Sequence, residues 1–500
     1  MAADGVIIAL DVGATGIKTV TAEVSGDHLA LRDIKSTATL PRESDGCSYV
    51  DIGRIIGELT ECVRSLGDER ILSAGIDTFG NGYGFLDGQG ELIALPYDYR
   101  DRRVGGILEE VHRHFTDRQL YDLVGNFPFR SRGLFHLYRD VLDQTDNIRR
   151  GSVMLPLPNL IEYLLTGNML SERTICSVLY MLDSRGENWN AEAFGRLGIP
   201  MDFLIPVTEP GRRAGIIRSG VPEDVKSRRI PLINVIGHDT ESALITVPSM
   251  NEKHLFACLG TSFIFGTRPD HPVITDQSFG ARFKNMRGAF GKYSLCKDFP
   301  GFWLLEQCME EWRKSGSELT YEQVSRMARS VNDNETWLNL NDERFRIYGN
   351  IFEKVRSFCE GTGQIYPQDQ VHMAACLFES YCLFIRWNAQ CLGIITGEHF
   401  EVLDAFNGGV RNSVLMQMLS DCLQMKVAAH GKNASACGNI LMQYAVLTGK
   451  RHPAELEKAA EDLSEPRMYR PDPAMAEYWN RRYEQFTRRV IRSDENGQSN

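Results

Sequence analysis

A short pattern occurs twice in this 500-residue chain: an apolar strand, a turn of small residues, and a second extended stretch. The first copy covers residues 6–24 and carries Asp11 at the end of its first strand. The second copy covers residues 255–266 and carries Thr261 in its turn, with no carboxylate equivalent to Asp11. Small residues in such turns let phosphate oxygens approach the backbone closely. Two domains that each begin with such a hairpin would face each other across a cleft.

The first hairpin has two interpretations, because a strand ending in Asp-x-Gly is also an ordinary β-turn. It is not a Walker loop, since no Gly-Lys-Ser/Thr follows and residues 19–24 alternate like a strand. A dinucleotide fingerprint is excluded for the same reason, because it needs a helix after the glycines. The Asp11 carboxylate and the amides of the turn at 12–16 suit a magnesium-bound phosphate. A phosphate site and a plain turn both stay open at this point.

Composition limits the partners of the chain. The length favours two domains, and 43% hydrophobic and 24% charged residues are typical of a soluble globular protein. A net charge of -11 without a basic run argues against nucleic acid and anionic membranes. We find no secretory signal at the N-terminus and no run long enough to span a membrane. The sequence therefore predicts a cytoplasmic protein, with its oligomeric state, monomer or homodimer, left open.

The twelve cysteines form no Cys-x-x-Cys pair, which disfavours a zinc ribbon and a redox motif. We interpret them as free thiols, mostly buried. Whether Cys359 and Cys376 ever pair is not decided by the sequence.

Apolar strands alternate with helical stretches, which predicts an α/β layer architecture. The predicted strands are 6–10, 71–76, 232–236, 255–259, 263–266 and 402–406, and the predicted helices include 104–115, 157–165, 301–312, 372–391 and 413–425. The Pro248-containing stretch marks a boundary. We expect an N-terminal domain at 1–248, a C-terminal domain at 249–485 and a polar tail at 486–500.

Two further strand ends carry candidate functional groups. Asp239 follows the strand 232–236 and precedes a helical segment, where it is either a functional carboxylate or a helix cap. A hydroxyl that attacks a phosphate needs a base. Of the two carboxylates Asp11 and Asp239, one can therefore hold the metal and the other the substrate hydroxyl. The glycines at 408–409 follow the strand 402–406 and suit either a flat ring lying against the backbone or a plain tight turn.

Together these motifs resemble the carbohydrate kinases of the FGGY group in the actin, hexokinase and Hsp70 superfamily, and within that group the chain is most similar to the rhamnulokinases. The segments that carry the resemblance are 11–18, 75–80, 99–101, 164–167, 238–240, 260–261, 272–275, 301–305, 362–364, 379–380 and 438–441. The resemblance implies two ribonuclease H-like (actin-like ATPase) domains flanking a catalytic cleft.

The resemblance also implies roles for single residues. Asp11 would position Mg²⁺, and Asp239 would be the general base on the sugar hydroxyl. The ATP contacts would be Ala14, Thr15, Gly16, Ile17, Lys18, Thr261, Asp298, Glu306 and Gly408. The sugar would be flanked by Gly80, His238 and Thr240, with Asn81 as a further hydrogen-bonding group.

The chain departs from the rhamnulokinase pattern where it faces the sugar. Phe79 replaces a Trp, and Asn81-Gly82 replaces Val-Asp, so a carboxylate acceptor is missing at Gly82. Lys18 stands where an Arg is usual, and Asp298 where an Asn is usual. A missing acceptor in a buried site can alter the choice of substrate.

We therefore expect an ATP-dependent carbohydrate kinase that phosphorylates L-rhamnulose or a related deoxyketose to its 1-phosphate. The alternatives are a sibling kinase for L-fuculose, L-xylulose or another ketose or polyol, and a catalytically weakened sensor that binds sugar and nucleotide.

Overall fold

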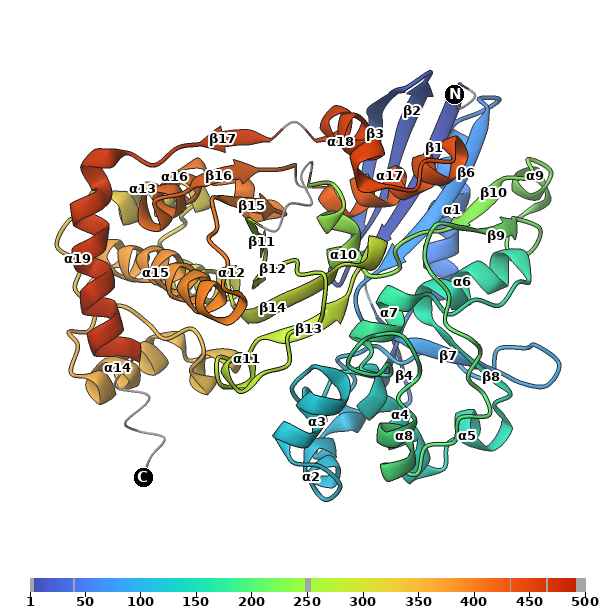
Figure 1. Cartoon of the computed structure of the whole chain (residues 1–500), viewed down its shortest axis with the longest axis horizontal. Coiled ribbons are helices and arrows are strands. Elements are labelled where there is room, and N and C mark those ends of the chain that lie inside the picture. Colours follow the sequence, from blue (N-terminus) through green and yellow to red (C-terminus); the bar gives the residue numbers. More distant parts are fainter. Residues whose placement is uncertain (1–3, 39–40, 248–252, 432, 465, 492–500) are drawn as a thin grey trace. The chain divides into compact units, whose positions relative to one another are not determined.

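The structure is a computed structural model that describes residues 4–38, 41–247, 253–431, 433–464 and 466–491 (Figure 1). It divides into two compact units. Unit 1 comprises residues 1–250, 268–295 and 433–464, and unit 2 comprises residues 251–267, 296–432 and 465–500. The predicted domains are consecutive, whereas each unit is built from separated stretches. The predicted boundary at residue 248 lies outside the described residues.

Unit 1 contains a six-stranded mixed sheet with the order β3-β2-β1-β6-β10-β9. Its strands are β1 (Gly5–Val12), β2 (Gly16–Ser25), β3 (His28–Ala38), β6 (Ile71–Thr78), β9 (Arg212–Ile216) and β10 (Pro231–Asn234). The hairpin β1–β2 is antiparallel, while β6 pairs parallel to both β1 and β10. The first predicted hairpin is therefore present, with β6 beside it.

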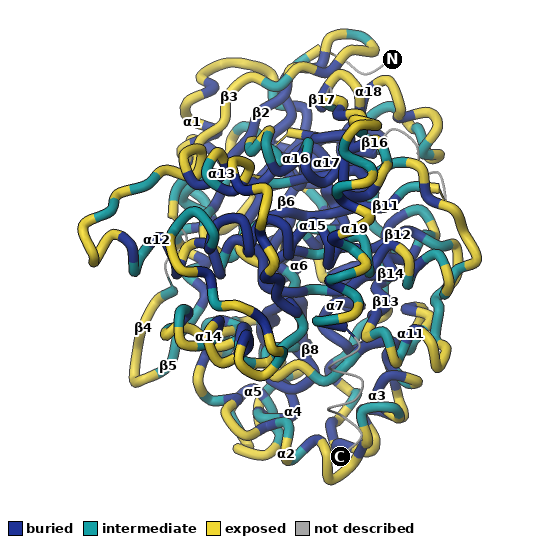
Figure 2. The backbone as a smooth tube through the Cα atoms, turned by 90° about the vertical axis from the view of Figure 1, so that its left-hand side faces the viewer, coloured by how far each residue is buried: buried dark blue, intermediate teal, exposed yellow. Residues whose placement is uncertain are grey.

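Both faces of this sheet are buried, which explains the uninterrupted apolar run in β1. Ile8 and Leu10 pack in one core cluster with helices α1 (Ile52–Ser65) and α6 (Leu157–Thr166). Ile7 and Ala9 pack in another cluster with α17 (Ala434–Thr448) and α18 (Glu457–Leu463). Figure 2 shows β6, a strand of the same sheet, in the dark blue that marks buried residues. The late segment 433–464 thus belongs to unit 1 because its helices cover the second face of that sheet.

Unit 2 repeats the same strand order. Its part of the second sheet runs β14-β12-β11-β15-β16-β17. The strands are β11 (His254–Leu259), β12 (Ser262–Thr267), β14 (Tyr293–Pro300), β15 (Val402–Phe406), β16 (Lys426–Ala429) and β17 (Arg467–Tyr469). An antiparallel hairpin, β11–β12, is again followed by two parallel neighbours and an antiparallel edge strand. The predicted duplication of the hairpin is therefore a duplication of the whole sheet.

The remaining elements lie around these sheets, except that β13 is the edge strand next to β14 in the second sheet. In unit 1 they are β4 (Arg42–Ser44), β5 (Cys47–Tyr49), β7 (Tyr83–Leu86), β8 (Val153–Pro156), β13 (Lys284–Arg287), α2 (Ile107–His112), α3 (Asp117–Val124), α4 (Gly133–Asp143), α5 (Asp146–Arg150), α7 (Arg173–Val178), α8 (Ala191–Arg196), α9 (Glu223–Lys226), α10 (Asp239–Leu244) and α11 (Asp276–Gly280). In unit 2 they are α12 (Phe302–Lys314), α13 (Tyr321–Ser330), α14 (Ile351–Thr362), α15 (Gln370–Thr396), α16 (Ser413–Leu423) and α19 (Ala476–Phe486). Short 3₁₀ turns occupy 102–104, 289–291, 343–346, 408–411, 453–456 and 473–475.

Two predicted elements differ from the observed ones. The helix predicted at 104–115 is broken into a 3₁₀ turn and α2, because Gly106 takes a φ of 72°, which interrupts helical geometry. Residues 487–491, which we assigned to the polar tail, form a π-helical turn with buried Val490 and Ile491. Cys359 and Cys376 are buried free thiols. Within the described residues, no helix is both long and apolar enough to cross a membrane.

Candidate active site

Three carboxylates and one ammonium group meet at the carboxyl end of β1 and β6. Asp11 pairs in register with Lys18 on β2 and with Asp77 on β6. Lys18 Nζ lies 3.0 Å from Asp11 Oδ2. Burial lowers the pKa of Lys18, but the Asp11 carboxylate outweighs it and the pKa is raised on balance. The first hairpin therefore presents a fixed positive charge next to its carboxylate.

Asp77 is fully buried in this group of charges. Its Oδ1 accepts a hydrogen bond of 2.6 Å from Asn439 Nδ2 on α17, and its Oδ2 has no partner among the described residues. Burial and the nearby Asp11 charge raise its pKa well above the usual value. Burial and the neighbouring carboxylates thus favour the protonated form of Asp77.

Asp239 is the first residue of α10, and His238 is the N-cap residue, without a side-chain cap bond. Asp239 Oδ1 accepts the backbone N–H of Thr240 at 2.6 Å and lies 3.3 Å from its hydroxyl. Burial and the Asp11 charge raise the pKa of Asp239 to about 7. Its side chain keeps 26% exposure, which leaves the carboxylate open to an incoming hydroxyl. A carboxylate with a pKa near neutral pH is suited to general base catalysis.

His238 packs tightly against the turn that follows β6. A Cβ at Gly80 would lie 2.8 Å from His238 Nε2, so the glycine permits this approach. Burial and the nearby positive charges of Arg132 and Lys284 lower the pKa of His238 to about 3, and the imidazole is neutral. His238 therefore offers a hydrogen bond without a charge.

Glu172 holds the backbone in front of Asp239. It is fully buried and its Oε2 accepts the N–H of Gly237 at 3.0 Å. The same carboxylate caps α7 by accepting the N–H groups of Thr174 and Ile175. Burial raises the pKa of Glu172 to about 7. This residue fixes the position of the turn that carries His238 and Asp239.

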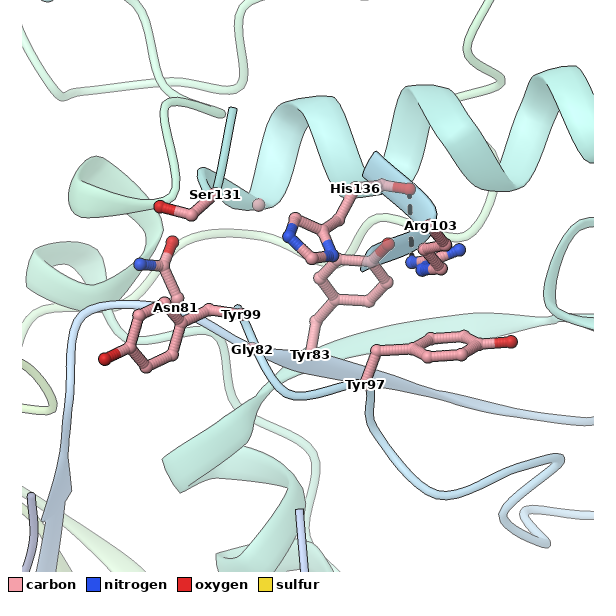
Figure 3. Close-up of a pocket in the computed structure, with 9 residues that line it drawn as sticks. Asn81, Gly82, Tyr83, Tyr97, Tyr99, Arg103, Ser131 and His136 are labelled. Carbon is pink, nitrogen blue, oxygen red and sulfur yellow. Dashed lines mark hydrogen bonds between the residues drawn. The ribbon is translucent and has the colours of Figure 1, made fainter. Parts of the chain in front are cut away.

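A small pocket adjoins Asn81 and Gly82 (Figure 3). Its volume of about 10 Å³ holds one water-sized group. Among the described residues, Asn81 Oδ1 and His136 Nε2 are buried without hydrogen-bond partners. Burial, with a further contribution from Arg103, lowers the pKa of His136 to about 3, so its ring is neutral. The pocket presents these two neutral polar groups beside the Arg103 guanidinium, and such groups can hydrogen-bond a hydroxyl.

The charged segment 99–103 is anchored on one side, although Arg100 and Arg102 are exposed. Asp98 and Asp101 are buried, and Arg103 donates to Asp140 at 2.7 Å while stacking over Tyr97. Tyr99 lines the pocket of Figure 3. This segment therefore builds the wall of the pocket.

The predicted phosphate turn exposes backbone more than side chains. Gly13 N–H donates to Gly16 O at 2.9 Å, which closes the turn. Thr15 is exposed, whereas Ile17 is buried in the core cluster. Ile17 can therefore contact a phosphate only through its backbone.

Unit 2 contains a cavity of about 710 Å³ beside the second hairpin. Thr261, Glu306 and Gly408, three of the predicted nucleotide residues, line it. Gly408 has open space where a Cβ would stand, and Tyr321 donates a 3.0 Å hydrogen bond to Glu306. Asp298 lies on β14 and is not among the described residues that line the cavity. A nucleotide-sized space is therefore lined by three of the four ATP contacts predicted in unit 2.

Several lining or supporting residues were missed by the sequence analysis. These are Asn439, Glu172, His136, Tyr321, Arg411 and Asn412. Asn439 lies within the segment 438–441 of the resemblance, but only its tertiary contact with Asp77 reveals a role.

Comparison with known proteins identifies the family. The N-terminal domain model of the FGGY family of carbohydrate kinases matches residues 6–246, and its C-terminal domain model matches residues 255–446. The chain belongs to this family. The predicted family and the two-domain actin-like fold are therefore confirmed.

The relatives of this FGGY kinase include rhamnulokinases from Bacteroides thetaiotaomicron and Bacillus subtilis. They are 28% and 27% identical to it, each covering 87% of this chain and 89% of its own length. Among solved structures, a xylulose kinase from Rhodospirillum rubrum superposes with a TM-score of 0.78 at 17% identity, covering 97% of this chain and 98% of its own. A glycerol kinase from Plasmodium falciparum, solved with ADP, has a TM-score of 0.76 at 15% identity, with the same coverage. These structures share the fold.

Proposed function

We propose that this sugar kinase transfers the γ-phosphoryl group of ATP to a hydroxyl of L-rhamnulose or a related deoxyketose, giving the 1-phosphate. The rhamnulokinase relatives support this acceptor. The observation that carries the reaction is Asp239, an accessible carboxylate with a pKa of about 7 beside the Asp11–Lys18 pair. We also propose a cytoplasmic location, where ATP is available.

Each residue of the site has a part in the proposed reaction. Asp239 accepts the proton of the attacking hydroxyl, and Thr240 holds the carboxylate in place. Lys18 and the backbone of residues 14–17 attract the phosphates. His238 and Asn81 hydrogen-bond the sugar, while Thr261, Glu306 and Gly408 contact the nucleotide. We also propose that Asp298 contacts the nucleotide, and this assignment rests on the family resemblance alone.

The Asp11 carboxylate suits Mg²⁺, a hard cation that is commonly held by one or two carboxylates together with phosphate oxygens. Such an ion would neutralise charge on the transferring phosphoryl group. Its binding would also compensate the carboxylates of Asp11 and Asp77, which share one ammonium group in Lys18.

A second acceptor class, another ketose or a polyol, is favoured by Gly82. The family's aspartate is absent there, and Gly82 has a φ of 102°, a conformation that other residues adopt with strain. Restoring the aspartate therefore changes the backbone as well as the chemistry.

The experiment is an ATP-coupled assay over ketoses, polyols and deoxy sugars with the wild type, Gly82→Asp and Gly82→Ala. Gly82→Ala measures the effect of the strained backbone alone, because alanine adds no carboxylate. If the missing carboxylate sets the substrate, Gly82→Asp exceeds Gly82→Ala in kcat/KM on L-rhamnulose specifically. Equal values for the two variants on every sugar contradict that role. No turnover by the wild type, with tight sugar binding in calorimetry, favours a sensor.

A further inference from the structure

Unit 1 contains a large cavity with a positively charged lining. It measures about 810 Å³ and is lined by the turn before β9, the turn after β13, and the C-terminal end of α17. The cations around it are Arg212, Arg287, Lys450 and Arg451. We call this cavity the basic groove. None of the residues assigned to ATP, sugar or metal lines it.

The charges of the basic groove are only partly compensated. In the described part of the chain, none of its four cationic side chains forms an ion pair with a carboxylate. Glu209, the acidic residue of the lining, pairs with Arg173 at 2.5 Å. Glu455 accepts the backbone N–H of Arg451 at 3.0 Å and interacts electrostatically with Lys450. Arg287 lies over the Tyr293 ring and Lys450 over the Tyr444 ring, contacts that leave their charge in place. Four cations around one hollow of a chain with net charge -11 make it a local site for anions.

The floor of the basic groove is apolar. Phe290, Met442, Ala445 and Val446 contribute to it, and Phe290 has a φ of 56° in its turn. Strained backbone at a non-glycine residue is frequently associated with binding. An apolar floor under a cationic rim suits a ligand with a phosphate group and an organic body.

The groove also adjoins a helix of the active site. Met442 and Val446 line the groove, while Asn439 on the same helix donates to Asp77. Gln443, between them, donates to Asn439 and to Ile8 O. A ligand in the groove thus contacts the helix that holds a carboxylate of the catalytic cluster.

We propose that the basic groove binds a small phosphorylated organic molecule. A small ligand is favoured over nucleic acid because the net charge of -11 repels an extended polyanion, whereas the four cations act on a ligand within the hollow.

The test is calorimetry on the full chain with two probes, inorganic phosphate and glucose 6-phosphate. Reversing two charges in Arg212→Glu/Arg451→Glu should weaken binding of both probes roughly tenfold or more. The matched control is Arg42→Glu/Lys458→Glu, two exposed cations of unit 1 outside the groove, which should bind as the wild type does. Phe290→Ala should weaken the binding of glucose 6-phosphate and leave the binding of inorganic phosphate unchanged. This difference separates the contribution of the organic body to binding from that of the phosphate group.

Three results would overturn the proposal. One is the absence of binding by the wild type at about 10 mM probe. Another is binding that Lys18→Met abolishes and the groove variant leaves intact, because the phosphate would then occupy the hairpin. The third is a short single-stranded RNA that binds more tightly than glucose 6-phosphate and is lost in the groove variant.

Discussion

Glu162 provides a quantitative test of how the core beneath the sugar-side turn is built. Its carboxylate is fully buried on α6 and accepts hydrogen bonds of 2.9 Å from the side-chain amides of Asn159 and Asn234. Burial raises its pKa from 4.5 to about 8. Glutamine has the same shape and no charge, so Glu162→Gln imitates the protonated acid.

The pH dependence follows from this difference. Between about pH 4.5 and pH 8 the folded protein keeps the proton that the unfolded chain has released, so the free energy of unfolding falls as the pH rises. Each pH unit is worth about 1.4 kcal/mol, which gives about 5 kcal/mol over the range for this residue, an upper value for a site that can relax. Glu162→Gln lacks this contribution. We expect the variant to match the wild type near pH 5 and to be several kcal/mol more stable at pH 8.

The assay is urea unfolding at pH 5, 6, 7 and 8, with the midpoint and slope measured at each pH. Glu457→Gln, an exposed glutamate of α18, is the matched control and should follow the wild type throughout. The reasoning is refuted if Glu162→Gln parallels the wild type across the range or is less stable at pH 8.

Two further variants test the substrate contacts. Gly80→Ala places a Cβ 2.8 Å from His238 Nε2, so the KM for the sugar should rise about tenfold or more while the KM for ATP stays constant. Gly57→Ala is the control, because its Cβ meets open space. A shift in the KM for ATP alone would contradict the assignment. Tyr321→Phe removes the 3.0 Å hydrogen bond to Glu306 in the unit 2 cavity, so the KM for ATP should rise a few-fold with the sugar KM unchanged, and an unchanged KM for ATP would remove Tyr321 from the nucleotide site.

The duplicated architecture could be predicted from the sequence because both hairpins are local: strand, turn and strand follow one another in 6–24 and 255–266. Asp11 and Asp239 were found for the same reason, each standing at the end of an apolar strand. The α17 helix could not be placed this way. Its partner Asp77 is more than 350 residues away, and the segment 433–464 belongs to unit 1 because its helices bury the second apolar face of the first sheet.

The pocket beside Asn81 was only partly predictable. Asn81 and Gly82 were recognised as departures from the rhamnulokinase pattern, but His136 carried no sequence signal. Its importance comes from burial and from an unpartnered ring nitrogen, which are properties of the fold. Glu172 is similar, since its contact with Gly237 spans 65 residues.

The central claim is that Asp239 is the base of a phosphoryl transfer to a sugar. The most direct measurement is the single-turnover rate of phosphoryl transfer by Asp239→Asn, alongside calorimetric affinity for the accepted sugar. The account predicts a rate lower by about 10²- to 10⁴-fold with sugar affinity nearly unchanged, and a wild-type rate that falls as the pH drops below about 7. A rate comparable to the wild type in Asp239→Asn would contradict it.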